Sequence, residues 1–171
     1  MLIGKEVYLR ALEPEDIDLL YKWENDTEIW HLGNTFVPFS RKVLKEYLQQ
    51  AALDIYTTKQ LRLVICLSNG NAIGCIDLFE FDANNLRAGV GILIAERAEQ
   101  QKGFATDALK ILKAYCKEKL NLHQLFCNIS ADNEISYSLF AKNGFEKSGT
   151  KKNWQRKNTG YVDEYFLQCF L

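Results

Sequence analysis

Histidine and proline are scarce in this chain, each occurring twice in 171 residues. With two histidines and no Cys-x-x-Cys pair, the sequence lacks the ligand spacing of a zinc site, and we expect no bound metal. Apolar runs fall short of the roughly 18 residues that a membrane-spanning helix needs. Charged residues, Lys5, Glu6 and Arg10, interrupt the first apolar stretch, so we expect no signal peptide and no membrane partner.

An excess of positive charge is also missing. Lys plus Arg is 21 and Asp plus Glu is 22, which gives a formal charge of −1. Nucleic-acid-binding proteins normally carry a basic excess, so we expect no nucleic-acid partner. The hydrophobic fraction of 47% and the length of 171 residues are typical of one globular domain spanning residues 1–171. A chain of this size buries roughly 70% of its unfolded surface without disulfides or metals.

Five cysteines occur, each among apolar neighbours: Cys66, Cys75, Cys116, Cys127 and Cys169. Free cysteines are usually buried, and disulfides are rare in reducing compartments. We therefore expect five reduced, buried thiols in a cytoplasmic protein. A catalytic thiol would need a nearby base, and histidine is scarce.

The hydrophobic periodicity predicts a mixed α/β fold. An antiparallel meander is followed by one βαβ crossover into a parallel partner and then by a C-terminal hairpin. Asn69-Gly70 is a strong hairpin signal inside the meander, and residues 24–39 form a long loop. The predicted strands are 7–12, 61–67, 72–81, 88–95, 125–129, 145–154 and 161–170, and the predicted helices are 13–23, 40–51, 103–120 and 133–142.

The segment that joins the third meander strand to the long helix is the most informative. A glycine-containing turn that opens a helix leaves backbone N–H groups without partners, and with the helix dipole they form an anion site suited to a pyrophosphate. An ordinary strand-to-helix turn is the alternative, because a single glycine in a polar loop is a weak signal. The candidate residues are Gln100, Gln101, Lys102, Gly103, Phe104, Ala105 and Thr106.

Four motifs in order resemble the GNAT acyltransferase family. Gln100, Gly103 and Ala105 match its Gln/Arg-x-x-Gly-x-Gly/Ala signature. A downstream segment from Asn133 to Phe145 is similar to the later helix of the family, and residues 9–16 and 73–76 also look like it. The resemblance covers essentially the whole chain, and the ribosomal-protein and spermidine N-acetyltransferase branches are the most similar.

The resemblance implies a GNAT-like fold and an acetyl-CoA-dependent N-acetyltransferase. The acceptor would be a primary amine, either a small cationic amine or a protein N-terminus, and a homo-oligomer is possible in such a protein. Two parallel strands, 88–95 and 124–130, would splay apart and admit the pantetheine arm. Backbone groups of Leu93, Ile94 and Ala95 would pair with that arm, residues 101–106 would hold the pyrophosphate, and Asn133 and Ser136 would contact the arm from the far side.

The chain departs from the family at two catalytic positions. Phe140 stands where many relatives have a tyrosine that protonates the leaving thiolate, and Gly89 stands where many carry a glutamate near the amine. Tyr137, one helical turn earlier, is a candidate acid, and a packing tyrosine is its alternative reading. Asp77 falls on an apolar strand face with residues 73, 75, 79 and 81 and is a candidate base, against the alternative of a buried structural aspartate.

The loop over residues 24–39 is acidic and aromatic, and it mildly favours a cationic acceptor. Trp30 and His31 are candidate substrate contacts, and a solvated loop is the alternative. Two other functions stay open at this point. One is a non-catalytic acetyl-CoA-binding or regulatory protein, favoured by Phe140 and Gly89. The other is a general phosphate-binding or nucleotide-binding α/β domain.

Overall fold

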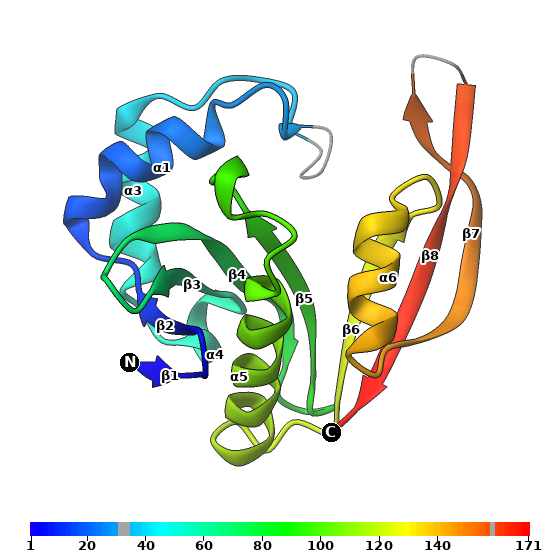
Figure 1. Cartoon of the computed structure of the whole chain (residues 1–171). Coiled ribbons are helices and arrows are strands. Elements are labelled where there is room, and N and C mark those ends of the chain that lie inside the picture. The colour runs from blue at the N-terminus through cyan, green and yellow to red at the C-terminus, as the bar shows by residue number, and fades with distance from the viewer. Residues whose placement is uncertain (31–34, 158–159) are drawn as a thin grey trace.

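The computed structural model describes residues 1–30, 35–157 and 160–171 (Figure 1). Its described strands form one sheet in the order β1-β2-β3-β4-β5-β6-β8-β7. Every neighbouring pair is antiparallel except β5 and β6, which are parallel. The strands are β1 Leu2–Ile3, β2 Val7–Ala11, β3 Leu61–Leu67, β4 Ala72–Asp82, β5 Arg87–Ile94, β6 Gln124–Ser130, β7 Glu146–Lys157 and β8 Gly160–Phe170.

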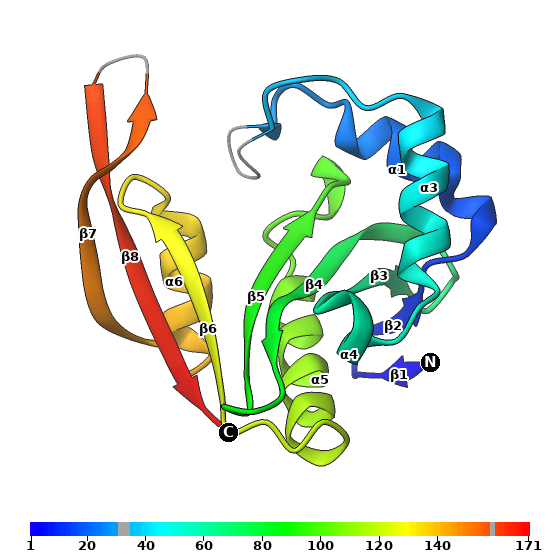
Figure 2. The ribbon, with the colours of Figure 1, turned by 180° about the vertical axis from the view of Figure 1, so that it is seen from behind.

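Helices cover the two faces of the sheet unequally. Helices α5 and α6 lie on one face, over the two halves of the sheet (Figure 1). Figure 2 shows α3 and α4 on the other face of the N-terminal half, whereas β6, β8 and β7 carry no helix there within the described chain. The helices are α1 Ile17–Glu24, α3 Arg41–Ala51, α4 Ile55–Thr58, α5 Phe104–Glu118 and α6 Glu134–Lys142, with 3-10 turns at Pro14–Asp16 and Arg97–Glu99.

The predicted mixed α/β architecture is confirmed: the antiparallel meander, the crossover through α5 and the C-terminal hairpin are all present. Two short elements, β1 and α4, were missed. Strand β1 has two residues, and α4 is a single turn held by the Asp54 carboxylate, which accepts the amides of Tyr56 and Thr57 at 2.9 and 3.0 Å. Such short elements carry no hydrophobic periodicity that a sequence pattern could reveal.

The predicted apolar face of β4 needs correction. Glu80 adopts φ +48°, and the pairing of β4 with β5 shifts register between Phe79 and Asp82. This bulge adds a residue, so Phe81 joins the main core with Ile76 and Leu78 instead of sharing a face with Asp77.

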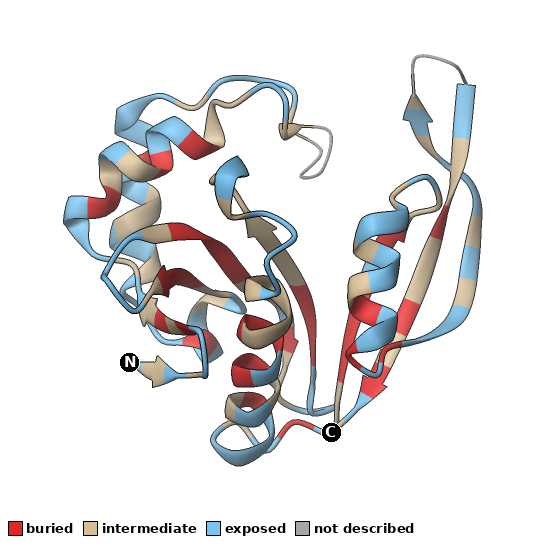
Figure 3. Cartoon of the chain, viewed as in Figure 1, coloured by how far each residue is buried: buried red, intermediate tan, exposed pale blue. Residues whose placement is uncertain are grey.

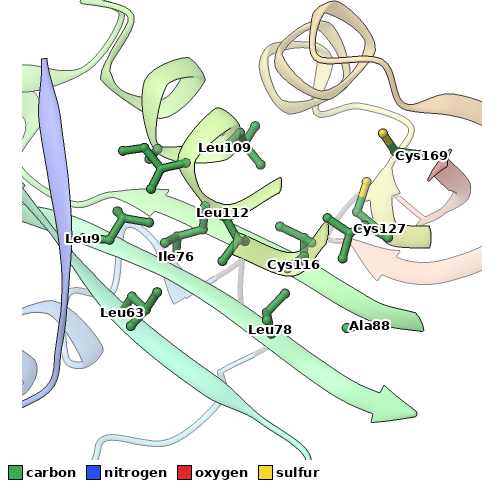
Figure 4. Close-up of a cluster of buried hydrophobic side chains, with 14 of the residues drawn as sticks. Leu9, Leu63, Ile76, Leu78, Ala88, Leu109, Leu112, Cys116, Cys127 and Cys169 are labelled. Atoms are coloured by element: carbon green, nitrogen blue, oxygen red, sulfur yellow. The ribbon is translucent and has the colours of Figure 1, made fainter. Parts of the chain in front are cut away.

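The main core lies between α5 and the sheet. Leu9, Ile76, Leu109 and Leu112 are fully buried there (Figures 3 and 4). All five cysteines are buried and free, as predicted. Burial raises the pKa of Cys75, Cys116 and Cys127 to about 12, so these thiols stay protonated and are poor nucleophiles at neutral pH.

Parallel pairing between β5 and β6 covers only their first residues. The register runs through Arg87↔Gln124, Ala88↔Leu125 and Gly89↔Phe126 and then ends. Beyond that point the strands diverge, and the sheet opens into a V that is visible from both sides (Figures 1 and 2).

Asp107 in the first turn of α5 ties the helix to the N-terminal strands. Its carboxylate accepts the backbone amides of Glu6 and Val7 at 2.7 and 3.0 Å. Burial alone would raise the pKa of Asp107, but these backbone hydrogen bonds outweigh it and hold the pKa below its usual value. A lowered pKa means that this stabilisation is present above the unfolded-state pKa and is lost as the pH falls through the folded-state pKa.

We expect Asp107→Ala to lower the free energy of unfolding by about 1–3 kcal/mol at neutral pH, because two amides lose a charged acceptor. Urea unfolding measures this change. Glu118→Ala, an exposed residue of the same helix, is the control and should change stability by less than about 0.5 kcal/mol. The difference between the two variants should shrink as the pH falls from neutral through the folded-state pKa of Asp107, and a difference that does not change with pH would contradict the assignment.

Candidate active site

The loop before α5 presents free backbone amides to one mouth of the V. Gln101 and Gly103 both adopt left-handed backbone conformations, with φ of +60° and +91°. Gly103 precedes the helix without a side-chain cap, and the Asp107 amide bonds the Gly103 carbonyl at 3.2 Å. The amides of Phe104, Ala105 and Thr106 precede the first helical hydrogen bond and so lack helical acceptors, which makes this helix start an anion site.

Side chains of the same loop hold it in shape. Gln100 Nε2 donates to the Ile94 carbonyl at 2.9 Å and so joins the loop to the end of β5. Lys102 forms an ion pair with Glu99 at 3.0 Å. The Ala95 amide donates to the Ile73 carbonyl at 2.8 Å. The Leu93 carbonyl also faces β4, beside Gly74. The predicted pairing of this segment with the pantetheine arm therefore depends on the Ile94 backbone, which faces the open edge of β5.

A cavity of about 680 Å³ occupies the V between β5 and β6. This volume is within the usual range of cofactor and ligand sites. Most of the predicted cofactor residues line it together: Leu93, Ile94, Gln100, Gln101, Gly103, Phe104, Ala105, Thr106, Asn133 and Ser136. Ala95 and Lys102 are outside this lining. Asn133 also caps α6, since its Oδ1 accepts the Ser136 amide at 3.0 Å.

Tyr137 is not brought to this cavity. Its ring packs edge-on against Tyr165 of β8, with ring centroids 5.7 Å apart, and the cavity lining does not include it. Phe140 does line the cavity and is buried, with its ring edge-on to Phe145 at 4.9 Å. The helix face that meets the cofactor site thus carries Ser136 and Phe140, and Tyr137 lies beside the C-terminal hairpin.

Phe79 occupies the space beside Gly89. The two residues are opposite each other in the β4–β5 ladder, and a Cβ at Gly89 would overlap the Phe79 ring. The Phe79 ring also packs edge-on against Phe126 of β6, with ring centroids 5.9 Å apart. An aromatic contact across the strands therefore replaces the glutamate that the family resemblance suggested for this position. Sequence reasoning noted the glycine but not its partner, because the pairing register was unknown.

Asp77 is held in an ion-pair cluster beside the cavity. Arg62 Nε and Nη2 donate to its two carboxylate oxygens at 2.8 and 3.0 Å, and Arg62 Nη1 also bonds Glu24. Each of the three side chains is about a quarter exposed. A Cβ on Gly91, which lines the cavity, would lie 3.9 Å from the Asp77 Cβ.

The bidentate pair changes what Asp77 can do. A carboxylate that binds a guanidinium through both oxygens is already paired with a cation, so the cluster is better suited to hold a second cation than to act as a free base. Tyr47 covers Arg62 with its ring centroid 5.4 Å from the guanidinium carbon, and burial raises the pKa of Tyr47 to about 12. Sequence reasoning missed Arg62, because one arginine within an apolar strand has no distinguishing signal.

The loop candidates are only partly placed. Trp30 is half-buried and its Nε1 donates to the Glu24 carbonyl at 2.8 Å, so it lies next to the ion-pair cluster. His31 lies outside the described residues. Across the described ranges, no cluster of three or more His, Cys, Asp or Glu side chains could hold a metal ion. No helix in those ranges is long and apolar enough to cross a membrane.

The sequence profile of the Acetyltransferase (GNAT) domain matches residues 6–146. The chain is a member of the GNAT acetyltransferase family. Among its relatives, the spermidine N(1)-acetyltransferase of Vibrio cholerae is 26% identical over 147 residues, with 86% of this chain and 83% of that protein covered. An uncharacterized N-acetyltransferase p20 of Bacillus licheniformis is 26% identical over 168 residues, covering 97% and 93%.

The solved structures agree with this family. The crystal structure of a Vibrio cholerae spermidine N-acetyltransferase in complex with CoA and spermine is similar at a TM-score of 0.87 and 25% identity, over 96% of this chain and 95% of that one. This GNAT protein is an N-acetyltransferase that uses acetyl-CoA as co-substrate and acetylates a primary amine. The non-catalytic alternative is not favoured.

Gly103 supplies a direct test of the cofactor loop. We expect Gly103→Glu to abolish acetyl-CoA binding, measured by calorimetry, because an added carboxylate would repel the pyrophosphate at the helix start. A Cβ at Gly103 meets no atom within 4 Å, so the fold has room for the side chain.

Gly70→Glu is a matched control for this variant. Gly70 has nearly the same φ, +92°, and its Cβ position is equally open, but it lies in the β3–β4 turn outside the cavity lining. Both variants carry the same backbone strain and added charge. Unchanged acetyl-CoA affinity in Gly103→Glu would remove this loop from the cofactor site.

The α6 residues give a second test, by thiol-release kinetics. We expect Tyr137→Phe to leave turnover within about twofold, because Tyr137 is outside the cavity lining. We expect Phe140→Tyr to raise turnover only modestly, because a thiol with a pKa of roughly 8.5 leaves well without a dedicated acid. A loss of tenfold or more in Tyr137→Phe, about 1.4 kcal/mol, would return Tyr137 to the role of general acid.

Proposed function

We propose that the acceptor is a small cationic amine that carries more than one amino group. The relatives from Vibrio cholerae and Escherichia coli are named spermidine N(1)-acetyltransferases, one relative from Mus musculus is named for tubulin, and one solved neighbour holds spermine. The observation that carries the proposal is the cluster of Glu24, Arg62 and Asp77. Two carboxylates share one guanidinium, so the cluster keeps a net charge of −1.

Partial burial makes this charge effective. The three side chains are about a quarter exposed, and electrostatic attraction is stronger there than in bulk water. Gly91 lines the cavity and places no side chain between it and Asp77, so a charged amino group of the acceptor can approach the carboxylates. The amino group that reacts must point to the thioester, and a second amino group can occupy this cluster.

The reaction sets the remaining requirements. A primary ammonium has a pKa of about 10, so the reacting group must lose a proton before it attacks the thioester carbonyl. The new C–N bond creates a tetrahedral oxyanion, and free backbone amides along the open edge of β5 are suitable donors to it. Collapse breaks the C–S bond, releases CoA and leaves the acetylated amine.

A screen for CoA thiol release with polyamines, short peptides and aminoglycosides tests the proposal. We expect polyamines to give the highest kcat/KM. Peptides whose N-terminal amine is already acetylated should give no thiol release. Faster turnover of an unblocked peptide would assign the acceptor to protein N-termini instead. The cytoplasmic location and the homo-oligomer remain predictions.

Asp77→Asn tests the cluster itself. We expect kcat/KM for a polyamine to fall about tenfold or more, equivalent to about 1.4 kcal/mol, with acetyl-CoA affinity unchanged, because the substitution removes a negative charge and keeps the side-chain size. Asp82→Asn is the control: Asp82 is on the same strand and also pairs with an arginine, Arg87, but lies outside the cavity lining. Equal kinetics for both variants would return Asp77 to a structural role.

A further inference from the structure

Strand β7 has a bulge at the wall of the cavity. Its pairing with β8 passes from Lys151↔Glu164 directly to Gln155↔Val162, so three residues of β7 lie opposite one residue of β8. Asn153, at the bulge, has φ +50°, and its amide donates to Asp163 at 2.9 Å. Bulges redirect side chains next to functional sites, and here the residue that follows, Gln155, lines the cavity.

A buried carboxylate fixes the orientation of Gln155. Glu164 is 6% exposed, and its two oxygens accept Lys151 Nζ at 2.8 Å and Gln155 Nε2 at 2.7 Å. Lys151 also donates to Asn128 Oδ1 at 2.9 Å. An ionised carboxylate only accepts hydrogen bonds, so the amide nitrogen of Gln155 must face Glu164. Its carbonyl oxygen then turns away from Glu164, and no donor to it is found among the described residues.

Gln155 lies on the side of the sheet away from the cofactor loop. Glu164, which it contacts, shares a sheet face with Phe166, whereas the alternate residue Leu167 joins the core beneath α6. On that same face Phe166 stacks near Phe126 with ring centroids 5.5 Å apart. The cofactor loop and Ser136 belong to the α5 and α6 side, so Gln155 faces the part of the V that the cofactor residues leave open.

We propose that Gln155 is a specificity-determining residue that accepts a hydrogen bond from the acceptor amine, and that Glu164 is the positioning residue that presents it. This inference rests on the proposed function. A carbonyl oxygen binds an N–H group without removing its proton, so Gln155 orients the amine opposite Asp77 across the V. The site is therefore completed by the C-terminal hairpin.

Two variants and one control test the inference in the full-length protein. Gln155→Met keeps the shape and removes the acceptor. Glu164→Gln keeps the size but allows the Gln155 amide either orientation. The control is Gln168→Met: Gln168 is on the same sheet face and donates to Gln124 at 2.7 Å, outside the cavity lining. Steady-state thiol release is measured while polyamine and acetyl-CoA concentrations are varied separately.

We expect Gln155→Met to raise KM for the polyamine about tenfold, with KM for acetyl-CoA unchanged. Glu164→Gln should raise the polyamine KM by a smaller factor, and the double variant should be no worse than Gln155→Met, because both act through the same oxygen. Gln168→Met should match the wild type in both KM values.

The outcomes separate this inference from the proposed function. If the wild type acetylates a polyamine and Gln155→Met keeps its KM for that amine, the inference is wrong and the function stands. A change confined to the acetyl-CoA KM would make Gln155 a cofactor contact and also overturn it. Additive effects in the double variant would remove Glu164 as the positioning residue. If the wild type acetylates no polyamine or other amine, both fail.

Discussion

Incomplete pairing between two parallel strands is the constraint on which the active site depends. Beyond Gly89 and Phe126, β5 and β6 are no longer hydrogen-bonded to each other. Backbone polar groups that are buried need partners, so an open edge inside a sheet is costly unless water or a ligand satisfies it. A cofactor arm that carries amides can take the place of the missing strand neighbour. The fold thus leaves the backbone groups beyond Gly89 and Phe126 unpaired between β5 and β6. The two half-sheets, with α5 and α6 packed on them, keep these strand ends apart.

The two faces of the N-terminal half-sheet have different chemistry next to the V, and each follows from the elements on that face. The start of α5 supplies backbone amides and suits an anion, because a left-handed glycine leaves the helix end uncapped. Residues from β3, β4 and α1 place two carboxylates around one guanidinium on the other side and suit a cation. A polyanionic donor and a cationic acceptor can therefore approach the same gap from opposite directions without competing for the same charges.

Much of the fold and part of the candidate site could be predicted from the sequence. The features that could not be predicted were missed for physical reasons. The loop from Gln100 to Thr106 was proposed because the chemistry of a glycine-containing helix start is local in sequence and because Gln100, Gly103 and Ala105 match the GNAT signature. The Arg62–Asp77 pair was not, since it depends on the register of β3 against β4. The bulges at Glu80 and Asn153 were also missed, because a left-handed conformation at a non-glycine residue leaves no pattern in the sequence. These features depend on strand register, whereas most residues of the predicted cofactor loop are close in sequence and line one cavity.

The contact between Phe79 and Gly89 links two positions that a sequence comparison would treat separately. With the ring of Phe79 in place, position 89 has no room for a side chain, and with a carboxylate at position 89 the ring would have to leave. A side chain added at position 89 alone would clash with the Phe79 ring. Removal of the ring at position 79 alone would leave an unfilled space between β4 and β6. A glutamate at position 89 would therefore need the Phe79 ring to move or a second change at position 79. The two positions are coupled, and substitutions at them should be non-additive.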